Sequence, residues 1–201
     1  MDIRKATAAD HPVLIDTLVQ AFFKEEFGNW ALQLQHLPHQ KKLQRLSLYY
    51  ALQLQTMAQP FNEVYCNQDQ TAVALWIPPH QWDFNLKQQL ALLPKLLRIV
   101  PPLHLYKVLK VIDLVQQHHP KAAHYYLQLI GVQPTFQGQG WSRKVLQPIL
   151  QRADQEQLPC YLETATADNV ALYRHYGFEV LYHLHDLPYA APAIWGMWRE
   201  P

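Results

Sequence analysis

The chain has little net charge and no long apolar run. Its 17 lysine and arginine residues almost balance its 16 aspartate and glutamate residues, which leaves a formal net charge of +1. Because no block of basic residues occurs, we expect no binding to nucleic acid or to an anionic membrane. No apolar run approaches the roughly 20 residues of a transmembrane helix, and the N-terminal stretch MDIRKATAADHP lacks the apolar core of a secretory signal.

Cysteine is scarce as well. The two cysteines, Cys66 and Cys160, lie far apart in segments that are typical of β-strands. We expect both to be buried and reduced, which favours a cytoplasmic protein. A chain of 201 residues can bury a substantial core. Since no internal repeat or flexible linker interrupts it, we expect a single domain over residues 1–201.

Short strands and several helices are expected before residue 120. The predicted elements are strands at 2–6, 63–66 and 71–77 and a helix at 41–57. Asp10 precedes an apolar-periodic segment and can cap its helix, with Pro12 in the first turn. Residues 83–119 form a helical insert that we expect to break at Pro94 and at the Pro101–Pro102 pair.

From residue 122 onward the pattern alternates between strands and helices. The order is a strand at 123–132, a helix at 138–153, a strand at 160–164, a helix that ends at Gly177, and two further strands. Two parallel strands that are joined by a helix require a right-handed crossover. Asp168 or Asn169 is expected to cap the second helix. The pattern predicts an α/β fold.

The loop before the helix at 138–153 is a candidate anion site. It consists of Gln137, Gly138, Gln139, Gly140, Trp141 and Ser142. Its glycines let backbone N–H groups approach a phosphate closely, and the helix that follows adds the positive end of its dipole. The loop matches neither a Walker motif nor the three-glycine dinucleotide fingerprint. By itself, a glycine-bearing turn before a helix is often only a turn.

The wider context of this loop resembles a known family. Gln137-x-x-Gly140-x-Ser142 is similar to the Q/R-x-x-G-x-G/A signature of the GNAT superfamily of N-acetyltransferases. The segment IGVQP before it, and Asn169 followed by Tyr173 and Gly177-Phe178, resemble further cofactor-binding segments of that superfamily. Ser142 stands where the family usually has glycine or alanine. The resemblance is dense from about residue 122 onward and thin before it.

The resemblance implies a fold and a reaction. The fold would be a mixed central sheet that is splayed at its middle, with helices on both faces and the insert at 83–119 as an addition. A β-bulge is one way to produce such a splay. The cofactor-binding core would span residues 122–178. Acetyl-CoA would be the co-substrate, a small-molecule primary amine the acceptor, and the acetyl group would pass directly between them in a ternary complex.

The resemblance also implies roles for backbone and side chains near the splay. Backbone groups of Ile130, Gly131 and Val132 would bind the pantetheine and the thioester carbonyl, where an amide donor stabilises the oxyanion. Asn169 would bond the pantetheine or the strand edge; plain helix capping is the alternative. Tyr173 is the candidate general acid for the departing thiolate; the alternative is one more packed aromatic near Tyr176.

A base is needed because the amine arrives as an ammonium ion. Glu163, in the strand at 160–164, is the first candidate, and a solvated side chain without a catalytic role is the alternative. His124 is the second candidate. We expect no metal site, since His118 and His119 would point apart on a helix and the pair His183 and His185 lacks a clear third ligand.

The acceptor side is less well defined by the sequence. The first two helices and the insert would line the acceptor side. Aromatic residues there would favour an apolar or aromatic amine, and the candidates are Trp30, Tyr49, Trp82 and Tyr106. These four side chains could equally be part of the core. Glu25 and Glu26 could attract a cationic acceptor or form ordinary surface. A protein or peptide acceptor, and a non-catalytic CoA-binding sensor domain, are the alternatives to a small-molecule enzyme. The sequence leaves the oligomeric state open, a homodimer included.

Overall fold

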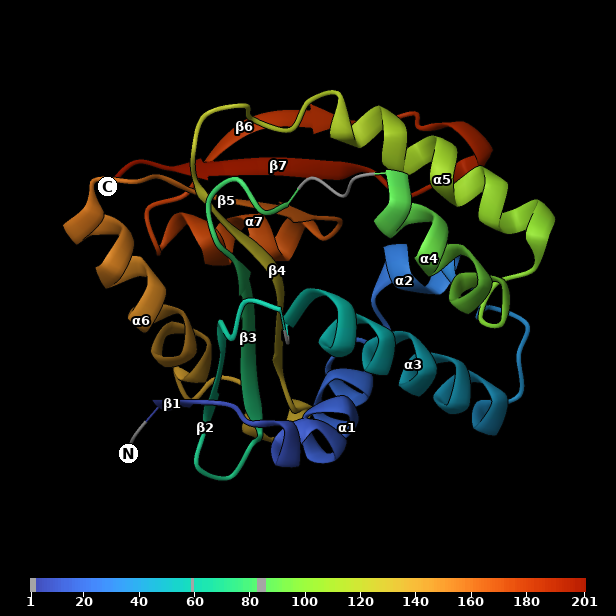
Figure 1. Ribbon diagram of the computed structural model, residues 1–201, viewed down its shortest axis with the longest axis horizontal. Coiled ribbons are helices and arrows are strands. Elements are labelled where there is room, and N and C mark those ends of the chain that lie inside the picture. Colours follow the sequence, from blue (N-terminus) through green and yellow to red (C-terminus); the bar gives the residue numbers. More distant parts are fainter. Residues whose placement is uncertain (1–2, 59, 83–85) are drawn as a thin grey trace.

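The computed structural model describes residues 3–58, 60–82 and 86–201. Its described strands form one sheet of seven in the order β1-β2-β3-β4-β5-β7-β6 (Figure 1). The strands are β1 (Ile3–Lys5), β2 (Val64–Asn67), β3 (Ala72–Ile77), β4 (Tyr125–Val132), β5 (Cys160–Thr164), β6 (Glu179–Leu184) and β7 (Ile194–Arg199). Only β4 and β5 pair in parallel; every other neighbouring pair is antiparallel. The predicted mixed sheet is confirmed.

Helices cover both faces of this sheet. The described helices are α1 (His11–Ala21), α2 (Glu26–Ala31), α3 (His39–Gln53), α4 (Leu86–Leu97), α5 (Pro102–Gln116), α6 (Trp141–Glu156) and α7 (Ala167–Arg174). Figure 1 shows α6 on one side of β3 and β4, with α1 and α3 on the other, while the strongly twisted sheet turns β6 and β7 across the top. None of the described helices combines the length and apolarity that crossing a bilayer requires.

Strand β3 divides the core into two clusters. All six of its side chains are buried, which is typical of a central strand with both faces covered. Val73, Leu75 and Ile77 pack in the cluster that includes α1 and α3. The intervening side chains pack with α6 and α7, and they are Ala72, Ala74 and Trp76. The alternation of the strand therefore assigns each side chain to one layer.

The sheet opens beside β4. The register between β3 and β4 shifts between Leu75, opposite Leu129, and Trp76, opposite Leu127, so Gln128 is an extra residue on β4. Strand β4 pairs with β5 only over Tyr125–Leu127. Beyond the bulge, no described strand pairs with the edge of β4 that faces β5. Both the splay and the bulge that the resemblance implied are therefore present.

Several local expectations are corrected. Asp10 is the N-cap residue of α1, but its carboxylate makes no capping hydrogen bond to that helix, because it accepts from the Thr7 N–H (2.7 Å) and from the Arg4 guanidinium. The N-cap of α7 is Thr166, so neither Asp168 nor Asn169 caps that helix. Both lie inside its first turn.

The long second helix and the insert also differ from expectation. Helix α3 ends at Gln53, and Leu54–Ala58 continues as a π-helical turn. Pro94 lies inside α4 rather than breaking it. The carbonyl that loses its partner belongs to Leu90, which is 59% exposed, so water can satisfy it. The break at Pro101–Pro102 occurs as predicted, with Pro102 as the first residue of α5. Residue 2 of the first predicted strand and residues 83–85 of the insert lie outside the described residues.

Candidate functional site

The loop before α6 has the geometry of an anion site. Gly138 and Gly140 have φ values of +75° and +76°, which side-chain-bearing residues rarely adopt. A Cβ atom on either glycine would meet nothing within 4 Å, so the surroundings of the loop are open. Gly140 is the N-cap of α6, and no side chain caps the helix there. The N–H groups of the first turn, with the positive end of the helix dipole, therefore fit the pyrophosphate that the resemblance implied.

The other residues of this loop hold its shape. The side-chain amide of Gln137 donates to the Val132 carbonyl at 3.1 Å and ties the loop to the end of β4. The amide of Gln139 lies 3.4 Å from the Thr135 carbonyl. Trp141 packs in the α6 cluster. Burial raises the pKa of the Tyr176 phenol, and the nearby Arg143 and Ser142 partly offset this rise.

The predicted backbone segment of β4 lies beside the splay. Ile130, Gly131 and Val132 follow the bulge and pair with β3 on one edge only. A Cβ atom at Gly131 would lie 3.1 Å from a methyl carbon of Leu18 and 3.2 Å from the Cβ of Ala21. A methyl group there would push α1 by a few tenths of an ångström, because α1 packs directly against the strand.

Asn169 and Tyr173 lie on α7. The Asn169 amide donates to the Thr164 hydroxyl at 3.3 Å, so its side chain contacts the end of β5. Tyr173 is only 5% exposed, and its ring meets Phe178 edge-on with centroids 6.0 Å apart. Burial raises the pKa of Tyr173 well above its usual value, so this phenol keeps its proton at neutral pH.

Glu163 is enclosed rather than solvated. Its carboxylate accepts hydrogen bonds from the hydroxyls of Tyr126 (3.0 Å), Tyr161 (2.7 Å) and Tyr182 (3.4 Å), and 19% of its side chain is exposed. Hydroxyl donors suit an ionised carboxylate, which can only accept. The alternative of a freely solvated Glu163 is therefore wrong. Its tyrosine partners pack in the cluster that includes α1 and α3.

Glu163 and Tyr173 belong to opposite faces of the sheet. Strand alternation puts Glu163 on the face of β5 opposite Leu162, and Tyr173 packs in the same cluster as Leu162. The structure therefore does not bring the two predicted catalytic side chains into contact.

His124 is occupied at both ring nitrogens. Its Nδ1 lies 2.7 Å from the Ala122 carbonyl, and its Nε2 lies 3.1 Å from Nε2 of His119. Burial lowers the pKa of His124 to about 4, so the ring is neutral at neutral pH. Neither nitrogen is available to an acceptor amine. Neither His118 nor His119 lies on a helix, because α5 ends at Gln116.

The tyrosines around Glu163 and the buried His119 were not predicted from the sequence. Strand alternation carried a usable signal for Tyr161, which lies two residues before Glu163 on the same face. Tyr126 is opposite Tyr161 in the parallel register, which only the strand pairing shows. No sequence pattern connects His119 with Glu163. Their proximity follows from how the segment after α5 folds over β5.

Two of the four proposed acceptor-side aromatics lie near this cluster: Trp82, and Tyr49, whose hydroxyl contributes to the raised pKa of Tyr126. The Trp82 ring stacks on His119 with centroids 3.8 Å apart. Trp30 is buried and donates to the Tyr189 carbonyl, while Tyr106 is 55% exposed. Glu25 caps α2 by accepting from two backbone N–H groups, so its carboxylate has a structural partner.

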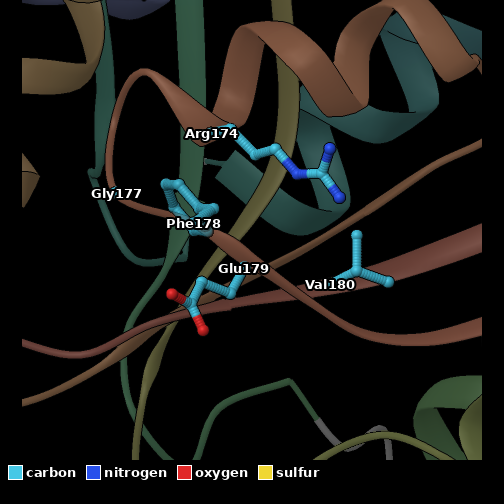
Figure 2. A pocket seen from close by; sticks show the side chains of 5 residues that line it. All are labelled: Arg174, Gly177, Phe178, Glu179 and Val180. Atoms are coloured by element: carbon cyan, nitrogen blue, oxygen red, sulfur yellow. The ribbon is translucent and has the colours of Figure 1, made fainter.

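In the part of the chain that the structure describes, neither a metal-binding cluster nor the surface hollow provides a second candidate for the active site. Within the described ranges, no group of three side chains of the types that bind metals lies close enough to hold an ion. A surface hollow of about 450 Å³ lies where α7 turns into β6, and its lining residues are Arg174, Gly177, Phe178, Glu179 and Val180. In Figure 2 the Glu179 carboxylate points away from the Arg174 guanidinium. The hollow includes neither Glu163 nor the loop at 137–142, so we do not assign the reaction to it.

Comparison with known proteins agrees with this geometry. Residues 105–180 match the acetyltransferase (GNAT) domain, from α5 to the start of β6. An uncharacterised N-acetyltransferase of Schizosaccharomyces pombe is 44% identical over 54 residues, which are 27% of this chain and 22% of that relative. The chain thus aligns with less than a quarter of the relative's length.

Two solved structures share the fold over nearly the whole chain. A structure described as histone acetyltransferase HPA2 and related acetyltransferase, from Corynebacterium glutamicum, gives a TM-score of 0.68 at 23% identity and covers 99% of this chain and 95% of its own. Arylalkylamine N-acetyltransferase 2 from Aedes aegypti gives a TM-score of 0.68 at 14% identity, with coverage of 99% and 98%. At these identities the likeness is one of fold, and the predicted fold class is confirmed.

Proposed function

We propose that this chain, whose residues 105–180 match the acetyltransferase (GNAT) domain, transfers the acetyl group of acetyl-CoA to the primary amine of a small molecule. One observation carries the proposal. The unpaired edge of β4 begins directly after its bulge and leads into the open, uncapped N-terminus of α6. A pantetheine arm on that edge and a pyrophosphate at that helix end would together position the thioester in the splay.

The two faces of the sheet would serve the two substrates. The amine enters from the side of α1 and α3, and Glu163 accepts a proton from the ammonium group. The amine nitrogen then attacks the thioester carbonyl, and the backbone of Ile130 to Val132 stabilises the oxyanion. When the carbon–sulfur bond breaks, Tyr173 donates its phenolic proton to the thiolate, and the second proton that the amine nitrogen loses restores the phenol. No covalent enzyme intermediate is needed in this ternary complex.

A small-molecule acceptor is favoured over a protein acceptor because neighbouring side chains enclose most of Glu163, the proposed base. The His119 ring lies next to Glu163, the Trp82 ring stacks on His119, and 19% of the Glu163 side chain is exposed. A small amine would reach so enclosed a carboxylate more readily than a segment of a protein. We further propose, from the resemblance of the segments AVALWIPP, QGQGWS and NVALYRHYGF, that the acceptor is similar to that of puromycin N-acetyltransferase. An aminonucleoside is therefore the first acceptor to test. The chain would act as one domain over residues 1–201, and its two buried free thiols suit the cytoplasm.

The proposal is tested by thiol release from acetyl-CoA with a panel of amines that includes an aminonucleoside, agmatine, an arylalkylamine and a basic peptide. We expect turnover with at least one small amine and none with the peptide. Tyr173→Phe should lower kcat about 100-fold or more while acetyl-CoA still binds. The matched control is Tyr189→Phe, which removes an exposed hydroxyl far from the splay and should leave the rate unchanged.

Two other results would favour the alternatives. Turnover with the peptide alone would indicate a protein acetyltransferase. Acetyl-CoA binding without turnover on any amine would indicate a sensor domain. If Tyr173→Phe and Tyr189→Phe acetylate at the same rate, Tyr173 is not the general acid.

A further inference from the structure

One buried nitrogen near the base has no hydrogen-bond partner. The side chain of His119 has no exposed surface, and its Nδ1 forms no hydrogen bond with any described residue. That nitrogen lies 3.8 Å from the Oε1 atom of Glu163. A buried polar atom without a partner is costly, so such an arrangement needs an explanation.

The hydrogen bonds on the other side of His119 fix where its proton lies. The Ala122 carbonyl can only accept, so Nδ1 of His124 must donate to it. Because burial keeps His124 neutral, its Nε2 carries a lone pair. Nε2 of His119 must therefore donate to His124 across their 3.1 Å contact. In neutral His119 this leaves a lone pair on Nδ1, on the side of the Glu163 carboxylate.

The pocket around this pair holds few other charges. The titratable and aromatic side chains that face His119, His124 or Glu163 are His80, Trp82, Tyr126, Tyr161, Tyr182 and Trp198. The Trp82 ring stacks on His119, and Tyr161 meets it edge-on at 4.6 Å. Tyr126 and Tyr161 donate to Glu163, and the Tyr182 hydroxyl shares a short hydrogen bond with that of Tyr161. All three phenols hold their own protons, because burial and that carboxylate raise their pKa values. The vacant position for a proton is therefore the one between His119 and Glu163.

We propose that His119 is a positioning residue that takes the amine's proton from Glu163 and holds it through the transfer. This inference rests on the proposed function. An ammonium ion that becomes an amide loses two protons: one ends on the CoA thiol and the other is released. The released proton first breaks its N–H bond and forms an O–H bond on Glu163. It then moves to Nδ1 of His119, which restores the carboxylate and creates an imidazolium.

The arrangement of His119 between His124 and Glu163 makes this second proton transfer favourable. When Nδ1 of His119 gains the proton, Nε2 of His119 keeps its hydrogen bond to His124. The proton transfer therefore breaks no hydrogen bond of His119. The new N–H group faces the carboxylate that has just become negative. A separation of 3.8 Å is longer than a hydrogen bond, but a small rotation of the Glu163 side chain closes it, and such contacts often tighten only when substrate is bound.

The tautomers can be measured without any activity. Protein labelled with ¹⁵N-histidine is studied by long-range ¹H–¹⁵N correlation at about pH 9, where unperturbed histidines are neutral. We expect His124 protonated on Nδ1 and His119 protonated on Nε2 with a bare Nδ1. The spectra of His119→Gln and His124→Gln assign the signals. A proton on Nδ1 of His119 with a bare Nε2 would overturn the proposal, whether or not the protein acetylates any amine.

Kinetics test the consequence. His119→Gln keeps an amide that can donate towards His124 but removes the acceptor next to Glu163. We expect kcat/KM about tenfold lower near neutral pH, with the deficit shrinking to about twofold as the pH approaches the amine's own pKa, about 10. The matched control is His36→Gln, at an exposed histidine, which should follow the wild-type profile. A deficit that stays constant across pH would mean that His119 only packs, and the proposal would fail.

Discussion

Gly196 in β7 is the position where a single methyl group should disturb the base most directly. It lies opposite Glu163 on β5 and opposite Tyr182 on β6. A Cβ atom there would lie 2.3 Å from the Cε1 and Cζ atoms of Tyr182. Carbon atoms pack at about 3.5 to 4.0 Å, so the ring must move by more than about 1 Å. Its hydroxyl, which lies within hydrogen-bonding distance of Glu163, moves with it.

The size of the effect follows from this overlap. Over-packing a core usually costs about 1 to 3 kcal/mol, and a lost hydroxyl contact adds about 1 kcal/mol. Gly196 does not have a positive φ, so the backbone itself accommodates alanine. We therefore expect Gly196→Ala to lower the free energy of unfolding by about 1 to 4 kcal/mol, entirely through the Tyr182 ring.

A double-mutant cycle tests this reasoning. Urea denaturation is measured for the wild type, Gly196→Ala, Tyr182→Ala and the double variant. Once the ring is absent, Gly196→Ala should cost less than about 0.5 kcal/mol. If Gly196→Ala costs the same with and without the Tyr182 ring, the overlap is not the cause and the assigned packing is wrong.

Three further predictions concern the site and its ionisation. Glu163→Gln should lower kcat/KM about 100-fold with unchanged acetyl-CoA affinity by calorimetry; an unchanged rate would exclude Glu163 as the base. Gly140→Ala forces a Cβ onto a positive φ at a cost of about 1 to 2 kcal/mol, so KM for acetyl-CoA should rise while kcat holds, and an unchanged KM would argue that the loop does not bind it. The folded pKa of His124, about 4, lies below its unfolded value of about 6.5, so the unfolded chain binds the extra proton between these values. The free energy of unfolding should accordingly fall by up to about 3 kcal/mol as pH drops from 6.5 to 4; denaturation of His124→Gln should show a shallower fall, and an equal slope in both proteins would contradict this assignment.

The second half of the fold was predictable because its signals are local. Strand β5 has the predicted bounds, and the alternation of strands and helices after residue 122 is present. Positive φ at Gly138 and Gly140 follows from their place in a turn before a helix. Hydrophobic periodicity and turn residues act over a few neighbouring positions. They can therefore be recognised in a single sequence.

Capping and helix continuity were harder to predict. Asp10 has the right type and place for an N-cap, but the Arg4 guanidinium and the Thr7 N–H bind its carboxylate first. A proline disrupts a buried helix more readily than an exposed one, and whether the helix around Pro94 is exposed depends on the fold of the whole chain. In both cases a tertiary partner or solvent decided between two locally acceptable structures.

The surroundings of Glu163 depend on contacts between distant segments. Its tyrosine partners come from β4, β5 and β6, and His119 reaches it from the end of α5. No spacing along the chain relates these residues. Sequence reasoning therefore identified Glu163 itself, but it left open whether the side chain was solvated or enclosed.

The central claim is that acetyl-CoA binds in the splay, with its pyrophosphate at the N-terminus of α6. Calorimetric titration of acetyl-CoA into the wild type and into Gly140→Ala tests it most directly. The account predicts saturable binding at one site per chain in the wild type and clearly weaker binding in the variant. Equal binding by both proteins would put acetyl-CoA elsewhere, and no binding by the wild type at millimolar acetyl-CoA would contradict the proposed function.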